Sequence, residues 1–384
     1  MRKCCTPNAY PALDRDAPVN IAEETIDWLY REQLQIGEQW SYLLPTGFTW
    51  WADHYAQTVE FLGQETGPNG ETGYRVGVRT ELLREVDLTE AALETINGLP
   101  MRAASMAGPV YDASARMLDL WSMVRVTDDN GGWMRYLLSA AAVTQIAEAR
   151  LLAPALAEAI GAVPATSGHP ESGPRDVPGE MAFAAATFAL SGDEPCAWPE
   201  AEFVDAVSRY MNRPPEALAR VEGHGVAVEF PFGDETSLCR LAGDQPHPLY
   251  GNGLLVLQSF PVPAAERLGE SGGIALALSL NAADLTREVT GYGLGSYSYD
   301  DGAVHFSGFV PNALHKPGLL QNLYASCAAR AHAMAARFTE GRWDGDAYSL
   351  DPAVLARRVE ERRATAPVME RPRGCPMMRA KTGG

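Results

Sequence analysis

The sequence is interrupted near its middle by a segment that neither a helix nor a strand can accommodate. Residues 161–180 read GAVPATSGHPESGPRDVPGE and contain four prolines and four glycines. Proline removes a backbone hydrogen-bond donor and glycine imposes no backbone preference, so both helical and strand periodicity end here. The interruption divides a chain of 384 residues into two parts, each of ordinary domain size. We therefore expect a linker at residues 162–180 between two domains.

The part before the linker contains recognisable helix and strand signals. Apolar residues at helical spacing predict helices, alternating or β-branched runs predict strands, and Asn-Gly or Asp-Gly pairs predict the turns between them. The expected elements are a helix at 22–34, strands at 54–62 and 74–83, a helix from Thr89 to Gly98, strands at 116–126 and 133–138 around a turn at 129–132, and a long helix at 139–160.

The part after the linker repeats this order. The expected elements are a helix at 200–211, strands at 218–230, 236–241 and 254–260, a short helix at 264–268, a strand at 274–280, a hairpin of 294–299 with 304–310, and a long helix at 318–338. Residues 118–157 and 296–336 can be superposed on their DDNGG and DDG turns. A repeated order of elements indicates an internal duplication.

The predicted fold is therefore α+β, with two tandem homologous domains that pack pseudo-symmetrically, each an antiparallel sheet covered by helices. The expected divisions are a helical extension at 1–40, a first domain at 41–161, the linker at 162–180, a second domain at 181–341 and a basic tail at 342–384.

This order of elements resembles the YbjN and type III secretion chaperone-like superfamily of small α+β domains. The resemblance is carried by the passages 118–156 and 296–338, above all by the strands Leu118-Asp119-Leu120-Trp121 and Val304-His305-Phe306 with the Ala-rich helices that follow. It implies a protein that binds extended or helical segments of client proteins without catalysing a reaction. The extension at 1–39, the apolar run at 274–280 and the basic tail lie outside the usual unit.

The charge balance restricts the classes of molecule that this protein is expected to bind. Lys and Arg total 31 and Asp and Glu total 49, so the formal net charge is −18. An acidic surface repels phosphate groups, which disfavours nucleic acids and anionic membranes as partners. No apolar run is long enough for a membrane span, no secretory signal is recognisable, and six scattered cysteines fit a reducing compartment, so we expect a cytoplasmic protein.

The tail has the opposite charge. From Pro352 onward eight basic residues face three acidic ones, which gives +5 and leaves −23 for the rest of the chain. Either the tail folds back on the acidic body or meets an acidic partner, or it is a solvated helix at 351–364 followed by disorder. The terminal Gly383-Gly384 could be a conjugation signal or a frayed end.

The strongest candidate binding residues are Trp50, Trp51 and His54, within the sequence Trp-Trp-Ala-Asp-His. Exposed indoles provide large contact areas at protein interfaces, so this segment could be a platform for a client peptide. The alternative is a strand packed on the first helix. Neighbouring side chains of a strand point to opposite faces, so a sheet with one buried face would bury one of the two indoles.

A hydrolase is the alternative function. Residues 269–273, GESGG, match the nucleophile-elbow pattern, and Asp284 and His305 follow Ser271 in the right order; an unrecognised pocket between the domains is the other candidate active site. An elbow needs a strand before the serine and a helix after it, whereas the reverse order is expected here. We therefore expect no catalytic residue.

The sequence also predicts no metal site and no cofactor. The seven histidines show no ligand spacing, and His169 and His247 lie in segments that favour solvated loops. The leading prediction is a non-catalytic module that binds a client protein segment. A third alternative is a self-associating protein whose sheets pair with a second copy as a homodimer.

Overall fold

The computed structural model describes residues 20–66, 70–175, 178–180, 182, 198–211, 219–220, 224–263, 265–286 and 292–339. The basic tail, the terminal glycines and the first 19 residues lie outside this part of the chain. Within it, none of the helices has both the length and the apolar character needed to cross a membrane.

The first half forms one antiparallel sheet with helices beside it. Its elements are α1 (Ile21–Trp28), η1 (Leu29–Gln33), η2 (Glu38–Trp40), β1 (Ser41–Leu44), β2 (Gly47–Trp51), β3 (Ala56–Thr66), β4 (Thr72–Arg84), α2 (Glu90–Arg102), β5 (Gly108–Asp112), β6 (Met117–Val126), α3 (Gly131–Ile160) and β7 (Val163–Pro164). The strand order is β1-β2-β3-β4-β6-β5, and β7 pairs with the end of β4.

The second half forms a second antiparallel sheet. Its elements are α5 (Glu200–Met211), β8 (Ala219–Arg220), β9 (Gly225–Phe232), β10 (Glu235–His247), β11 (Gly251–Pro261), α6 (Ala265–Thr286), β12 (Ser296–Asp300), β13 (Ala303–Pro311), η4 (Asn312–Leu314) and α7 (Leu319–Thr339). The strand order is β12-β13-β11-β10-β9-β8.

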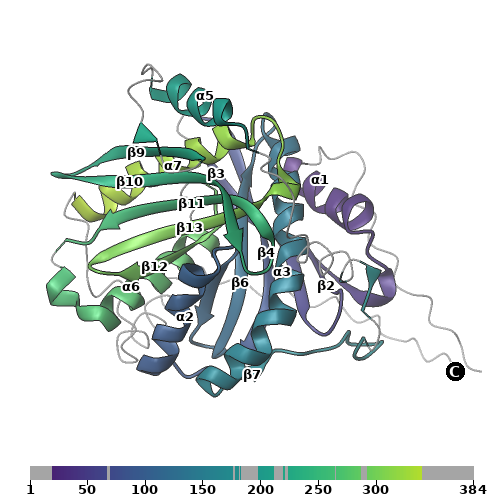
Figure 1. Ribbon diagram of the computed structural model, residues 1–384. Helices are drawn as coiled ribbons and strands as arrows, with labels where there is room; N and C mark the ends of the chain where they lie inside the picture. Colours follow the sequence, from purple (N-terminus) through teal and green to yellow (C-terminus); the bar gives the residue numbers. More distant parts are fainter. Residues whose placement is uncertain are drawn as a thin grey trace, which may run out of the picture.

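The two halves are repeats of one unit. A helix, four antiparallel strands, a helix, a hairpin and a long helix follow one another in both, and the order β1-β2-β3-β4-β6-β5 corresponds to β8-β9-β10-β11-β13-β12. The expected α+β fold with two similar domains is therefore confirmed. In Figure 1 the strands of the two sheets run crosswise, with α2 and α6 between them and α7 behind the second sheet.

The expected match between the DDNGG and DDG turns is wrong. Residues 301–302 join β12 to β13, so their counterpart is the turn at 113–116 between β5 and β6. The DDNGG segment instead precedes α3, which begins at Gly131 and includes residues 133–138, expected as a strand. Met134, Leu137, Leu138 and Ala141 lie at helical spacing and are all fully buried, which explains why the helix starts early.

The strand expected at 274–280 is also wrong, because these residues lie inside α6. The run IALALSL is buried almost throughout, so it lacks the polar face that distinguishes a helix from a strand in sequence. Gly269, at φ +66°, separates a first short turn from the rest of the helix. Gly273 allows close packing, since a Cβ there would lie 2.3 Å from the ring of Tyr299.

Each sheet is covered on one face by helices of its own repeat. In the first repeat α1 and α3 pack on β4, and in the second α7 packs on β9 and β11. The helices between β4 and β5 and between β11 and β12 also reach the other repeat: α2 packs on β12 and β13, and α6 packs on β5 and β6 as well as on β12 and β13 of its own sheet. Both main core clusters consequently contain residues from both repeats. The repeats therefore share one interior.

The expected linker is packed against the first sheet as far as residue 175. Residues 163–164 form β7 with β4, the Ala165 N–H donates to Leu82, and the Ser167 N–H donates to the His54 carbonyl. The imidazole of His169 is buried and bonds to the Ser41 carbonyl at 3.1 Å, so its expected exposure is wrong. Backbone N–H groups of this Pro-rich segment therefore have hydrogen-bond acceptors in the preceding domain.

Candidate binding site

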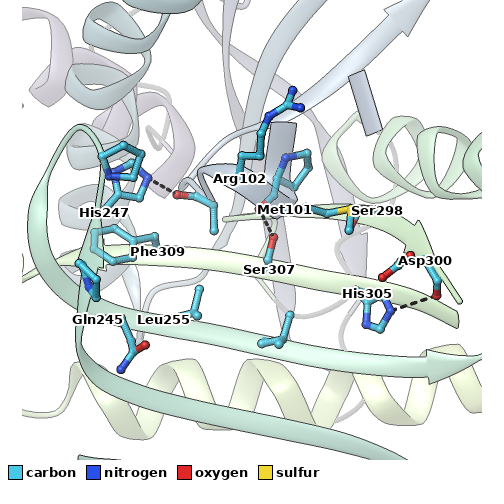
Figure 2. Close-up of a pocket in the computed structure, with 15 residues that line it drawn as sticks. Met101, Arg102, Gln245, His247, Leu255, Ser298, Asp300, His305, Ser307 and Phe309 are labelled. Atoms are coloured by element: carbon cyan, nitrogen blue, oxygen red, sulfur yellow. Dashed lines mark hydrogen bonds between the residues drawn. The ribbon is translucent and has the colours of Figure 1, made fainter. Parts of the chain in front are cut away.

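A cavity of about 430 Å³ opens on the outer face of the second sheet, the face that α7 does not cover. Its floor consists of outward-facing residues of β11, β12 and β13. Its roof is the C-terminal end of α2, and the β10–β11 hairpin closes one end (Figure 2). Because α2 belongs to the first repeat, both repeats contribute to this cavity.

The floor is apolar along β11 and mixed along β13. Leu255 and Leu257 alternate with inward-facing residues, so both leucines are half-buried and point toward the cavity. On β13, Ser307 lies opposite Leu257 and Phe309 lies opposite Leu255. The floor therefore offers the two aliphatic side chains of β11, whereas Phe309 and Ser307 are 2% and 4% exposed and the Phe309 ring packs on that of His247.

The roof exists because α2 ends above the sheet. Thr89 caps the start of this helix, as the sequence predicted, by accepting a hydrogen bond from the Ala92 N–H. Near its other end the Pro100 carbonyl accepts a hydrogen bond from the Ser307 hydroxyl at 3.3 Å. Met101, in the next position, keeps 51% of its surface exposed at the rim of the cavity. Such an exposed thioether is adaptable apolar surface.

His247 closes one end of the cavity. Its Nε2 lies 2.9 Å from the Ala104 carbonyl, and its Nδ1 accepts hydrogen bonds from the backbone N–H groups of Leu249 and Tyr250. Burial lowers the pKa of this imidazole to about 4, so it is neutral at physiological pH and carries its proton on Nε2. The expected solvated loop position is therefore wrong: His247 fixes the hairpin to the first repeat.

His305 lies at the opposite end, as Figure 2 shows. Its Nε2 lies 3.3 Å from the Asp300 carbonyl, which can only accept, so Nε2 carries the proton. Its Nδ1 then accepts from the Ser259 hydroxyl at 2.9 Å. The imidazole is therefore held by two protein partners.

A buried carboxyl group lies behind His247, beside a second and smaller cavity. Glu148 of α3 accepts hydrogen bonds from the hydroxyl groups of Ser105 and, at 2.7 Å, of Tyr250. Burial raises its pKa to about 7, although both hydrogen bonds oppose this shift. Glu148 and His247 both border this second cavity of about 20 Å³ between the repeats, large enough for one water molecule. This polar cluster holds the β10–β11 hairpin against α3.

The residues predicted from sequence as the binding platform lie elsewhere and are mostly buried. Trp50 is 2% exposed and donates its indole N–H to Gln57, while Trp51 is 6% exposed and donates to Ser167. Trp51 is covered by residues 167–175, with the His169 ring packed edge-on against it. Of the three predicted residues, His54 alone has an exposed side chain. Neither indole is therefore available as the exposed anchor that the sequence suggested.

The residues of the alternative nucleophile-elbow pattern do not come together. Ser271 is exposed in α6, and its hydroxyl donates to Glu90 at 3.3 Å. Asp284 is buried and accepts hydrogen bonds from Tyr297 and, at 3.2 Å, from Arg337. His305 bonds to Ser259, as described above. A helical turn rather than a strand precedes Ser271, so the strained strand-to-helix turn is absent at this position.

Within the described ranges, no group of three or more His, Cys, Asp or Glu side chains is arranged to hold a metal ion. The cavity on the second sheet was not predicted from the sequence, because three segments far apart in the chain build it. The signal that could have found it is a comparison of the two repeats in their correct register.

Comparisons of the chain with protein-family models, with curated proteins and with solved structures give no match. The resemblance to the YbjN and secretion chaperone-like superfamily therefore stays a prediction based on the order of elements.

Proposed function

We propose that this chain is a non-catalytic module that binds a segment of another protein in the cavity on the second sheet. The observation that carries the proposal is the apolar cavity of about 430 Å³ beneath α2, with an exposed methionine at its rim. Exposed apolar surface around a cavity is typical of sites that bind proteins, because solvent exposure of such surface is otherwise unfavourable.

The chemistry of the lining residues favours binding over catalysis. His247, His305 and Ser307 each bond to a backbone carbonyl of this chain. A nucleophile or general base needs a free proton acceptor or a paired activating group directed at the substrate. These three side chains instead stabilise the walls of the cavity. This favours a preformed surface that binds a ligand without altering it chemically.

The resemblance to secretion chaperone-like domains supports the same proposal, since the order of elements that carries it occurs twice in the chain. We include in the proposal a cytoplasmic location, because the buried thiols Cys239 and Cys327 are free cysteines. The net charge of −18 favours a client segment of positive charge, whose approach would be accelerated at low salt.

Photo-cross-linking tests the proposal. A photoreactive phenylalanine analogue at Leu257 places the reactive group on the cavity floor, and the same analogue at Glu229, an exposed position on β9, is the matched control. We expect one defined protein segment to be cross-linked from Leu257 in the native host and not from Glu229. Cross-linking with equal yield and the same partners from both positions would contradict a site in the cavity.

A further inference from the structure

At one equivalent position on the outer faces of their sheets, the two repeats carry side chains of very different size. β5 and β12 each contain five residues, and their first residues, Gly108 and Ser296, pair with Trp121 and Ser307. On its other side Trp121 pairs with Arg79 of β4, as Ser307 pairs with Leu257 of β11. Ser307 therefore occupies in the second repeat the place that an indole occupies in the first.

In the first repeat this indole is part of the packing between repeats. Trp121 is 9% exposed and clusters with Val110 and with Leu285 of α6. Gly77 makes room for it, since a Cβ there would lie 3.3 Å from the indole ring. The guanidinium of Arg79 lies 5.9 Å from the ring centroid. The indole thus fills the space between the outer face of the sheet and the helix of the other repeat.

In the second repeat the corresponding space is the cavity. Ser307 contributes a hydroxyl group where Trp121 contributes an indole, and the end of α2 takes the place of the end of α6. An apolar cavity of about 150 Å³ holds a benzene molecule. The volume of about 430 Å³ therefore accommodates an indole together with part of the chain that bears it.

The cavity also offers a partner for the polar edge of an indole. The Gln245 Nε2 donates to the Gly243 carbonyl at 3.3 Å, which leaves the Oε1 of this residue, at the cavity wall, as an acceptor. Leu255 and Met101 provide aliphatic and thioether surface on which an aromatic ring can pack. An aromatic side chain with an N–H or O–H group thus matches the cavity in shape and in polarity.

We propose that the cavity is a socket for one aromatic side chain of the client segment, about as large as tryptophan. This side chain would pack against the second sheet as Trp121 packs against the first. This inference rests on the proposed function and specifies the anchor of the client. An aromatic anchor in a central pocket is the commonest form of a binding hot spot.

The first experiment uses 5-fluoroindole as a probe, followed by fluorine NMR with the full chain. We expect saturable binding to the wild-type protein, loss of binding in Ser307→Trp, and wild-type binding in Glu229→Trp, which adds the same side chain on an exposed strand of the same sheet. Leu257→Asp, on the half-buried floor, provides a second variant if Ser307→Trp does not fold. Equal binding of 5-fluoroindole by wild type and by a folded cavity variant would overturn the proposal.

The second experiment selects binders from a library of random 12-residue peptides. We expect the selected peptides to share an aromatic residue, its replacement by alanine to weaken binding at least tenfold, and 5-fluoroindole to compete with them. Peptides without an aromatic residue that still lose affinity in Leu257→Asp would overturn the socket and leave the proposed function intact. Peptides that bind Leu257→Asp and wild type equally would contradict both.

Discussion

Asn97 forms two hydrogen bonds with the backbone of Tyr299: its Nδ2 donates to the Tyr299 carbonyl and its Oδ1 accepts from the Tyr299 N–H, both at 2.8 Å. Asn281 makes the equivalent pair with Tyr297, at 3.1 and 2.7 Å. One asparagine comes from α2 of the first repeat and the other from α6 of the second. Together they saturate the free edge of β12, so a client segment cannot add to the sheet at these residues.

Asn97→Ala should destabilise the protein by about 2 to 4 kcal/mol, because it leaves the buried N–H and carbonyl groups of Tyr299 without partners. Urea unfolding measures this change, and Thr95→Ala, at a half-buried position of the same helix whose hydroxyl bonds only to the preceding turn, should alter stability by less than about 0.5 kcal/mol. A loss no larger for Asn97→Ala than for Thr95→Ala would show that the repeats are not joined through this residue.

Glu148→Gln should change how stability depends on pH. The pKa of Glu148 is raised by burial from an ordinary 4.5 to about 7, so between these values the folded state binds more protons than the unfolded state. Stability should therefore fall as pH rises through this window, by at most about 3 kcal/mol from this residue.

Unfolding free energies of wild type and Glu148→Gln at pH 5 and pH 8 measure the effect. Asp119, whose pKa burial also raises to about 7, is present in both proteins, so the difference between them isolates Glu148. We expect the variant to lose less stability than wild type between the two pH values. Identical losses would mean that Glu148 is ionised throughout.

Ser271→Ala should leave the free energy of unfolding unchanged within about 0.5 kcal/mol, because the side chain is exposed and forms one hydrogen bond, to Glu90. A fluorophosphonate probe should not label the wild-type protein at this residue. Labelling at Ser271 would revive the hydrolase alternative.

The amide protons of Ala165 and Ser167 should exchange slowly with solvent, since they donate to the carbonyl groups of Leu82 in β4 and of His54 between β2 and β3. Hydrogen exchange followed by mass spectrometry tests this expectation directly. Exchange at the rate of an unstructured peptide would restore the free linker that the Pro- and Gly-rich sequence predicted.

Local sequence signals predicted much of the fold, and long-range packing explains what they missed. The hairpin of β3 and β4 and the Thr89 cap depend on neighbouring residues and were predicted from them. By contrast, α6 is enclosed by both repeats, so its apolar run resembled a strand. The expectation for Trp50 and Trp51 assumed a sheet with one solvated face, whereas residues 167–175 cover the second indole.

The site was harder to predict than the fold. The partner of His247 is the Ala104 carbonyl, 143 residues away in the sequence, so nothing near this histidine indicates its burial. The difference between Trp121 and Ser307 is visible in the sequence, but it has meaning only after the hairpins of the two repeats are aligned correctly. Superposing the DDNGG and DDG turns concealed it.

The most direct test of the central claim is the affinity of the client segment identified by cross-linking, measured as a synthetic peptide by isothermal titration calorimetry. We predict at least tenfold weaker binding to Leu257→Asp than to wild type, with the affinity of Glu229→Ala and the melting temperature of both variants close to those of wild type. Equal affinity of wild type and a correctly folded Leu257→Asp would contradict the account, because the client would then bind outside the cavity.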